Sequence, residues 1–455
     1  MDILAPVSRK VIAPLWAAWE KSPYLSHYRD LLKTQFDPPE VITGRQLMDV
    51  QKLVCHAYQT VPFWKKRIDA SGLDVEKIES LADLQYLPIL TKTELRAEGN
   101  RLLSTRFSLK DVYKHTTSGS TGTSVVTYSD EACQQFKRGA TLRSDEWSGW
   151  RLGERKALIW GNPQIRQDWK GKVRRALLDR DYVYLDTLMM NEQSMEKFTD
   201  TLVRISPSML FGHAHSLYLF ASYLRAKRPE VKIKPNAVLS TCMVLHDFER
   251  KRIESVFSCP VTNRYGCEEV SLIACECRTG EGLHVNADCL FVELVDENEN
   301  VCSPGKPGRV VVTDLKNFAM PILRYEVGDM AVWADKPCSC GRTLPLLSRV
   351  EGRVADYVAI SDGSYISGIS LTENFAVKVP GVAQMQIVQE DIDQFTFNMV
   401  KGDDFDSDSL QILNDLVLQY FGVKVKYNCV YLNRILPEKS GKYRFCISKV
   451  EKKYN

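Results

Sequence analysis

The sequence predicts an α/β protein with a large N-terminal domain of mixed α/β sheets and a small α+β C-terminal domain. The chain has 455 residues, whereas a single hydrophobic core stops growing beyond about 250–300 residues. Between about residue 156 and residue 350, short apolar strands alternate with helices, which is the pattern of an α/β sheet. After Gly352 a strand opens a second, α+β pattern. We therefore expect domains of residues 1–352 and 353–455.

The first part of the chain, up to about residue 105, is expected to be helical. Apolar residues recur every three to four positions in LMDVQKLVCHAYQTVPFWKKRIDASG, and Gly72 is suited to end a helix. Thr91 and Glu94 have the spacing of a capping box at the start of another helix.

The alternating region follows. Strands and helices are expected, in chain order, in KALIWG, MEKFTDTLVRISPSMLFG, SLYLFASYLRA, NAVLST and FERKRIESVFSCPVTNRYG. From 282 to 335 the chain changes to strands and turns, with Asp-Glu-Asn-Glu-Asn and Pro-Gly clusters at the turns, and this predicts a strand-rich subdomain. The C-terminal domain is expected to contain the strand QFTFNMV, the helix DSDSLQILNDLVLQYFG, the strand VKYNCVYLNRI and a charged tail.

Composition narrows the class of protein. Sixty basic residues against 57 acidic ones leave a net charge of +3, which gives no argument for nucleic acid binding. Arg9, Lys10, Pro14 and Glu20 interrupt the N-terminal apolar residues, so we expect neither a signal peptide nor a membrane span, and a cytoplasmic location. An odd count of 13 cysteines favours reduced thiols and a metal site over a disulfide framework.

A segment rich in Thr, Ser and Gly, TTSGSTGTS at residues 116–124, lies between the strand-like stretches VYKH and SVVTY. Its glycines permit positive φ angles, so that backbone N–H groups can converge on an anion, and hydroxyls add further donors. The alternative is a flexible linker, which the flanking strands argue against. A P-loop needs Gly-Lys at this point, but Gly122 is followed by Thr123, so the positive charge must come from elsewhere.

Three further motifs could complete a phosphate site. Glu269 in NRYGCEEV could hold Mg²⁺, Asp329 in MPILRYEVGDMAVW could bind vicinal hydroxyls, and Lys442 lies in LPEKSGKYRF. Taken singly, each has a plain structural alternative: solvated glutamates, a Gly-Asp turn and an exposed basic loop.

In this order the motifs resemble the adenylate-forming superfamily of acyl-coenzyme A ligases and adenylation domains. The closer likeness is to the phenylacetate–coenzyme A ligase branch and its CapK-like relatives in capsular polysaccharide biosynthesis. The stretches that carry this closer likeness are LPILTKTEL, YGCEEVSLIACEC, GLHVNADCLFVEL, AMPILRYEVGDM and CSCGRTLPLLSRVEGR. The resemblance as a whole covers nearly the whole chain.

The resemblance implies a site for ATP and Mg²⁺. Glu269 would help to hold Mg²⁺, Asp329 would bind the ribose hydroxyls with help from Arg353, and Lys442 would bridge the substrate carboxylate and the α-phosphate. The loop residues that would enclose the ATP phosphates are Ser118, Gly119, Ser120, Thr121, Gly122 and Thr123. Residues expected to line the nucleotide and acyl sites are Ser240, Thr241, Cys242, Met243, Tyr265, Gly266, Cys267 and Glu268.

His213 and His215, in GHAHS, are weaker candidates for the acyl pocket wall. A histidine in such a turn is as often a structural hydrogen-bond donor.

Two departures from the superfamily pattern stand out. The phosphate loop does not continue into the lysine that is often found there, and the hinge segment has Ala355 where an aspartate is usual, before Asp356. Rotation of a mobile C-terminal domain is a trait of the superfamily, so the second departure bears on that movement.

The cysteines are concentrated in two clusters, Cys275-Glu-Cys277 and Cys338-Ser-Cys340, with His284 between them. Three thiolates and one imidazole satisfy tetrahedral zinc, and the expected ligands of a structural Zn²⁺ are Cys277, His284, Cys338 and Cys340. Cys275 is a competing ligand, and buried free cysteines are the plain alternative.

A basic segment, WKGKVRRALLDR at 169–180, is expected to be helical. It could meet a phosphorylated partner or an anionic membrane surface, although charge runs are usually solvated faces.

The predicted activity is ATP-dependent formation of an acyl-adenylate with release of pyrophosphate, followed by acyl transfer. By family, coenzyme A is the expected acceptor. An amine acceptor would make an amide synthetase, and a phosphopantetheine arm would make a carrier-loading enzyme. A different class, an inactive nucleotide-binding scaffold, is disfavoured because Glu269, Asp329 and Lys442 are all present. The resemblance makes a homodimer plausible.

Overall fold

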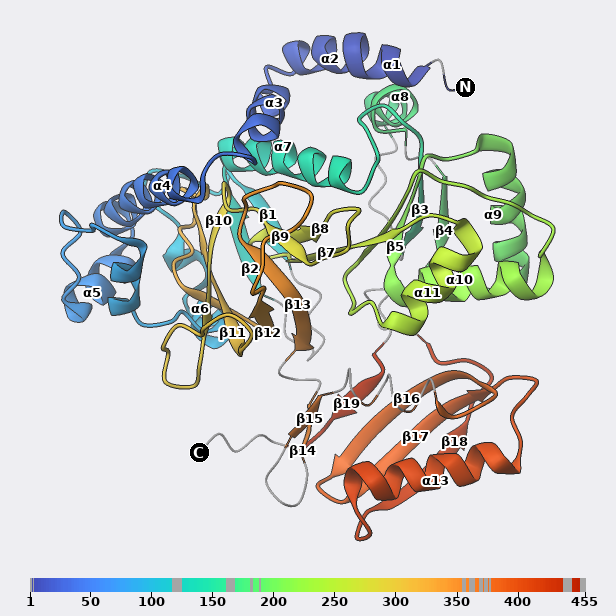
Figure 1. The fold of residues 1–455 in the computed structure, drawn as a ribbon. Coiled ribbons are helices and arrows are strands. Elements are labelled where there is room, and N and C mark those ends of the chain that lie inside the picture. The colour runs from blue at the N-terminus through green and yellow to red at the C-terminus, as the bar shows by residue number, and fades with distance from the viewer. Residues whose placement is uncertain are drawn as a thin grey trace.

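The computed structural model places a large α/β domain next to a small C-terminal domain and confirms the predicted fold class (Figure 1). It describes residues 2, 4–116, 125–160, 168–180, 183–187, 190–353, 357–359, 365–367, 371, 375, 378–436 and 444–450. In this described part of the chain, no helix combines the length and apolarity needed to cross a bilayer.

The N-terminal third is helical, as expected, and it contains 3-10 and π-helical turns as well as α-helices. Its α-helices are α1 (Leu4–Val7), α2 (Ala13–Trp19), α3 (Tyr24–Thr34), α4 (Pro39–Thr60), α5 (Pro62–Ser71) and α6 (Lys92–Glu98). A π-helical turn, Ser8–Ile12, joins α1 to α2. The expected signals hold: Gly72 adopts a left-handed conformation after α5, and Thr91 and Glu94 form a capping box before α6.

One sheet of eleven strands organises the large domain, in the order β10-β11-β12-β13-β9-β8-β7-β6-β5-β3-β4. Its parallel part comprises β3 (Lys156–Trp160), β4 (Val183–Asp186), β5 (Met209–His213), β6 (Ala237–Thr241) and β7 (Val261–Cys267). Its antiparallel part comprises β8 (Ser271–Glu276), β9 (Leu283–Val285), β10 (Leu290–Val295), β11 (Pro307–Asp314), β12 (Tyr325–Trp333) and β13 (Leu346–Arg353). The expected strand-rich region therefore forms the antiparallel part of the same sheet.

Helices cover the parallel strands because strands buried on both faces need apolar partners. These helices are α7 (Glu131–Trp147), α8 (Trp169–Arg174), α9 (Glu192–Ile205), α10 (Ala214–Lys227) and α11 (Asp247–Phe257). A π-helical turn, Arg175–Asp179, follows α8. Phe220 and Phe257, both fully buried, lie in the core between α10, α11 and the sheet.

A small antiparallel hairpin stands apart from the large sheet. It consists of β1 (Tyr113–Thr116) and β2 (Val126–Ser129), which pair from Tyr113 opposite Ser129 to Thr116 opposite Val126. The Thr/Ser/Gly segment thus connects two paired strands, which argues against a linker between domains.

The C-terminal domain has its own four-stranded sheet and core. Its elements are β14 (Tyr357–Ala359), β15 (Tyr365–Ser367), β16 (Val382–Asp391), β17 (Gln394–Lys401), α13 (Ser407–Phe421), β18 (Lys426–Tyr431) and β19 (Cys446–Ser448). The sequence predicted only a charged tail after β18, but β19 lies there and pairs in parallel with β16. Three residues amid charged neighbours give too short a pattern to indicate a strand.

Candidate functional site

A cavity of about 560 Å³ opens where the β1–β2 hairpin and α7 meet the ends of β6 and β7. Ligands of open α/β sheets bind at the carboxyl ends of parallel strands, and β6 and β7 are parallel neighbours. Of the expected site residues, the cavity is lined by Thr241, Cys242, Gly266, Cys267, Glu268 and Glu269.

Glu269 is the buried acid of this cavity and retains its negative charge. Its Oε1 accepts a hydrogen bond from the Tyr325 hydroxyl at 3.0 Å and lies 3.1 Å from Lys92 Nζ. Burial alone would raise the pKa of Glu269, but the positive charge of Lys92 and the hydrogen bonds to the carboxylate hold the pKa below its usual value. An ionised carboxylate is the oxygen ligand that Mg²⁺ prefers.

Tyr265 and Asp329 are linked across the sheet. The Tyr265 hydroxyl donates a hydrogen bond to Asp329 Oδ2 at 2.9 Å. The antiparallel register of β12 and β13 also sets Asp329 opposite Arg353. The two residues that the resemblance assigns to the ribose hydroxyls are therefore neighbours on adjacent strands.

Near its end, β7 approaches β8 closely at Gly266, which lies opposite Leu272. A Cβ atom at this position would lie 2.6 Å from the carbonyl oxygen of Ser271, so only glycine fits. In the next residue, burial and then the charge of Glu269 raise the pKa of the Cys267 thiol well above its ordinary value. Cys267 therefore stays protonated and is a poor nucleophile.

The end of β6 supplies another wall of the cavity. Ser240 is fully buried and Thr241 nearly so, whereas Cys242 is half-buried and adopts a left-handed backbone with φ of 66°. Such a conformation in a residue other than glycine is uncommon and is often found at binding sites.

His213 and His215 lie away from the cavity lining. His213 packs against Trp160, with ring centroids 4.3 Å apart, and Trp160 itself lines the cavity. The His215 Nδ1 atom lies 2.9 Å from Oε1 of the fully buried Glu249. His213, at the end of β5, thus packs behind the Trp160 side of the cavity. His215, in α10, forms a buried pair with Glu249.

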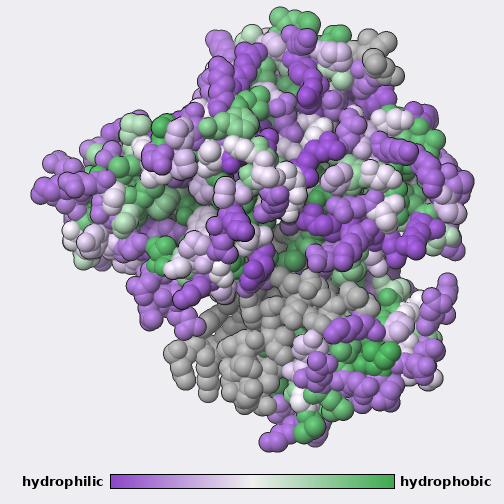
Figure 2. All heavy atoms as spheres, in the orientation of Figure 1, coloured by the Kyte–Doolittle hydropathy of each residue, from purple (hydrophilic) through white to green (hydrophobic). Residues whose placement is uncertain are grey.

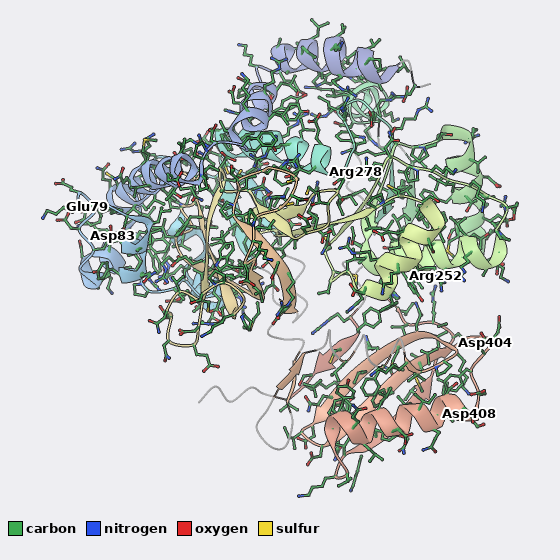
Figure 3. All side chains as sticks on the ribbon, viewed as in Figure 1. Glu79, Asp83, Arg252, Arg278, Asp404 and Asp408 are labelled. Atoms are coloured by element: carbon green, nitrogen blue, oxygen red, sulfur yellow. The ribbon has the colours of Figure 1, made fainter. Side chains whose placement is uncertain are left out.

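The His215 side chain also faces the C-terminal domain. The Phe445 ring, from the C-terminal domain, lies 4.9 Å from the ring of His215 and 5.6 Å from the ring of His246. Arg252, labelled in Figure 3, lies on α11 on the side that faces this domain, with its guanidinium 5.9 Å from the Tyr218 ring. Phe445 follows Lys442 by three residues, so this contact fixes the chain close to the predicted catalytic lysine.

The loop residues Ser118–Thr123 and the hinge residues Ala355 and Asp356 lie outside the described residues, as does Lys442. The stems of the loop are described and are firmly held. His115 Nε2 lies 2.9 Å from Ser129 Oγ, which accepts a hydrogen bond from Gln134 of α7 at 2.6 Å. The two strands and α7 are therefore joined at the base of the loop.

A second cluster brings together the four residues expected to bind zinc. The ligand atoms of Cys277, His284, Cys338 and Cys340 all lie within 4.8 Å of one another. Cys277 Sγ and Cys338 Sγ are 3.7 Å apart, and Cys340 Sγ is 3.3 Å from His284 Nε2. Burial and two nearby arginines lower the pKa of His284 to about 4, which leaves the imidazole in the neutral form that binds metals.

Cys275, the competing ligand, is not part of this cluster. Its thiol is fully buried, and its Sγ lies 4.0 Å from the carbonyl oxygen of Ser144. The cluster links the end of β8 and β9 to the connection between β12 and β13.

Sequence reasoning missed three residues of the site: Lys92, Tyr325 and Lys137. Lys137 Nζ donates hydrogen bonds to Asp314 and to the carbonyl oxygen of Val270, which follows Glu269. The capping box at Thr91 fixes the start of α6 and so the place of Lys92, but no local pattern reveals that its partner lies 177 positions further on. Tyr325 is part of the motif that contains Asp329, and that motif was the signal that could have found it.

Comparisons with known proteins find similarity to CapK and to phenylacetate-coenzyme A ligases. Residues 358–449 match the CapK C-terminal domain family. Protein CapK of Staphylococcus aureus is 22% identical over 434 residues, which are 95% of this chain and 94% of that protein. A phenylacetate-coenzyme A ligase of Thermus thermophilus is 27% identical over 330 residues, which cover 71% of this chain and 73% of that protein.

Solved structures share the fold. A 2-hydroxyisobutyryl-CoA ligase in the postadenylation state, in complex with 2-HIB-AMP, has a TM-score of 0.72 at 18% identity and covers 91% of each chain. The same enzyme in the thioesterification state has a TM-score of 0.60, also at 18% identity and 91% of each chain. An amide bond synthetase from Marinactinospora thermotolerans has a TM-score of 0.53 at 14% identity, covering 73% of this chain and 68% of that one.

Proposed function

We infer that this chain, whose resemblance to adenylate-forming ligases of the phenylacetate–coenzyme A ligase and CapK branch is confirmed by its relatives, activates a carboxylic acid with ATP. A carboxylate oxygen of the substrate attacks the α-phosphorus, the bond to pyrophosphate breaks, and an acyl-adenylate forms. The observation that carries this proposal is the ionised, buried Glu269 in the cavity that the β1–β2 hairpin helps to line.

The residues of the chain divide the work of the first step. The backbone and hydroxyls of Ser118–Thr123 cradle the phosphates, and Glu269 offers a carboxylate to Mg²⁺, which neutralises phosphate charge when bound. Asp329 and Arg353 hold the ribose hydroxyls. The walls for the adenine and the acyl group are formed by Ser240–Met243 and Tyr265–Glu268, with His213 behind Trp160.

Lys442 supplies the positive charge that the loop lacks. We propose that the C-terminal domain, residues 353–455, brings Lys442 to the α-phosphate and the carboxylate, and that it moves after adenylation. The TM-score is higher with the postadenylation state of the 2-hydroxyisobutyryl-CoA ligase than with its thioesterification state. This difference supports a domain arrangement like that of the postadenylation state. Phe445 in its contact with His215 and His246 holds the segment next to Lys442 against the large domain.

Coenzyme A is the acceptor that we favour for the second step, because four of the relatives are phenylacetate-coenzyme A ligases. The thiol sulfur would attack the acyl carbon and AMP would leave. The full-length likeness to CapK and the fold shared with an amide bond synthetase keep an amine on a sugar or amino acid as the second candidate. We also propose a cytoplasmic location, which would suit an ATP-dependent reaction and the free cysteines of the chain.

The direct test is release of pyrophosphate from ATP that depends on an added carboxylic acid, with hydroxylamine as a surrogate acceptor. A panel of aryl, fatty and amino acids should contain at least one that supports release. If no acid in the panel does so while ATP still binds, the chain is a nucleotide-binding scaffold.

A structural Zn²⁺ is part of the same proposal, at Cys277, His284, Cys338 and Cys340. Tetrahedral zinc with sulfur at about 2.3 Å and nitrogen at about 2.0–2.1 Å separates two thiolates by about 3.8 Å and a thiolate from an imidazole by about 3.5 Å. The observed distances, 3.7 Å from Cys277 Sγ to Cys338 Sγ and 3.3 Å from Cys340 Sγ to His284 Nε2, agree with these separations. The ion would fasten the β12–β13 connection to β8 and β9.

Zinc is tested by metal analysis and thermal unfolding. We expect one zinc per chain in the purified protein, and we expect Cys338→Ser to lose it and to lower Tm, because structural zinc contributes folding free energy. The control is Cys55→Ser, since Cys55 lies on α4 away from the cluster. Protein without stoichiometric zinc, together with an unchanged Tm in Cys338→Ser, would exclude the site.

A further inference from the structure

At the top of the large domain, helices α1 and α2 lie next to α8 (Figure 1). The N-terminal segment, residues 4–19, runs antiparallel to residues 169–179. Arg180 pairs with Asp2 at 2.8 Å at one end, and Lys170 pairs with Glu20 at 3.2 Å at the other. Between them the Ser8 hydroxyl donates to the carbonyl oxygen of Leu177 at 2.6 Å.

The N-terminal segment turns its small residues inward and its large apolar residues outward. Its most buried residues are Ala5, Ser8, Ala13 and Ala17, each at most 6% exposed. The large side chains of both segments that are exposed are Leu4, Val7, Val11, Leu15, Trp19, Trp169, Val173 and Leu177. We call these eight residues the apolar face. A helix that serves only the core would have the opposite arrangement.

The apolar face is concentrated and well exposed. Leu15 is 66% exposed and Trp169 is 71% exposed. Figure 2 shows hydrophobic residues interspersed with hydrophilic ones along the upper edge of the molecule, where these helices lie. Single exposed apolar residues need no explanation, whereas a contiguous set of this kind indicates an interaction surface.

The surroundings of the apolar face are basic. Residues 2–21 and 168–180 contain eight Lys and Arg against four Asp and Glu, an excess of four positive charges where the whole chain has +3. Several of these charges are paired, such as Arg174 with Asp179 at 2.9 Å. Lys10, Lys21 and Lys172 are exposed and form no ion pair with any residue that the structure describes.

We propose that the apolar face docks on the surface of an anionic lipid bilayer. Leucine, valine and tryptophan side chains on one side of a helix, with lysines at its margins, are typical of helices that lie in the headgroup region. The excess of positive charge around the apolar face favours an anionic partner. A second copy of the chain would set one basic surface against another, whereas anionic headgroups complement it. Such docking would bring the active site to a substrate or acceptor at the membrane.

The test is flotation of the full-length protein with lipid vesicles. We expect binding to vesicles of phosphatidylcholine with phosphatidylglycerol, and much weaker binding to phosphatidylcholine alone. The double variant Val11→Glu/Leu15→Glu should lower the binding at least about tenfold, because it puts two charges into the apolar face. The matched control is Val203→Glu, an equally exposed valine on α9. Lys10→Gln/Lys172→Gln should weaken binding and reduce its dependence on salt.

Thermal unfolding of each variant checks that the fold is retained. The flotation test itself needs no assumption about the enzyme's activity. Two results would overturn the proposal. One is wild-type protein that does not float with anionic vesicles, or floats as well after Val11→Glu/Leu15→Glu. The other is lipid-free protein that sediments as a dimer and becomes a monomer in that variant, since a second copy would then cover the face.

Discussion

At the scale of single residues, the site depends on one carboxylate whose charge is maintained by a lysine from a distant helix. Glu269 is 6% exposed, and a buried carboxylate without a partner would bind a proton. Lys92, at 3.1 Å, and the Tyr325 hydroxyl offset the free energy cost of burying the negative charge. A group whose pKa is lowered stabilises the fold at neutral pH, and this contribution is lost as the pH falls through its folded pKa.

Lys92→Gln tests this pairing. Without the positive charge, burial dominates and the pKa of Glu269 rises. The acid limb of the pH profile for pyrophosphate release should therefore shift to higher pH, and the Mg²⁺ concentration needed for half-maximal rate should rise at the acid end. Lys66→Gln, an exposed lysine on α5, is the control. An acid limb in Lys92→Gln that coincides with that of wild type would show that Lys92 does not set the charge of Glu269.

Single residues also show how far the sequence could go. Motifs in the sequence predict Glu269 and Asp329 as site residues. The sequence also predicts Cys277, His284, Cys338 and Cys340 as metal ligands, and the structure brings these four residues together. The sequence favoured Cys277, but spacing could not exclude Cys275 as a competing ligand, because only the fold shows that Cys275 lies beside Ser144. Lys92 could not be assigned, because its contact with Glu269 joins residues that are distant in the chain.

At the scale of secondary-structure elements, periodicity predicted most strands and helices but missed β19. This strand is three residues long, and its pairing with β16 comes from tertiary contacts. It matters because it begins one residue after Phe445 and four after Lys442. Backbone bonds such as Ile387 N–H to the Phe445 carbonyl at 2.6 Å anchor this segment to the C-terminal sheet.

Phe445→Ala tests the contact between this segment and the large domain. The variant keeps the Lys442 side chain but lacks the ring that holds the neighbouring segment against the large domain. Pyrophosphate release should therefore slow on the order of 10- to 100-fold, with little change in the KM for ATP. Acyl transfer from supplied acyl-adenylate should be unaffected. Phe445→Tyr should keep most of the rate, and Val423→Ala, at a residue 85% exposed in the same domain, should have no effect. Equal slowing of both half-reactions would indicate a merely structural role.

At the scale of the whole molecule, the function that we propose divides the work between the two domains: the large domain would hold the nucleotide, and the C-terminal domain would supply the lysine that starts the reaction. The cavity, Glu269 and Asp329 belong to the large domain. Lys442 belongs to the sequence of the C-terminal domain, which lies below the large domain in Figure 1. The sequence predicted two domains from length and pattern, but it could not give their contact, because Phe445, His215 and His246 are brought together only by the fold. In the function that we propose, the second domain supplies the lysine that the phosphate loop lacks.

The most direct measurement is carboxylate-dependent pyrophosphate release by the wild type and by Lys442→Ala, with ATP binding followed in parallel. We predict release by the wild type and a loss on the order of 10²–10³-fold or more in the variant, while ATP binding is retained. Undiminished release by Lys442→Ala would contradict the assignment of the catalytic charge to the C-terminal domain.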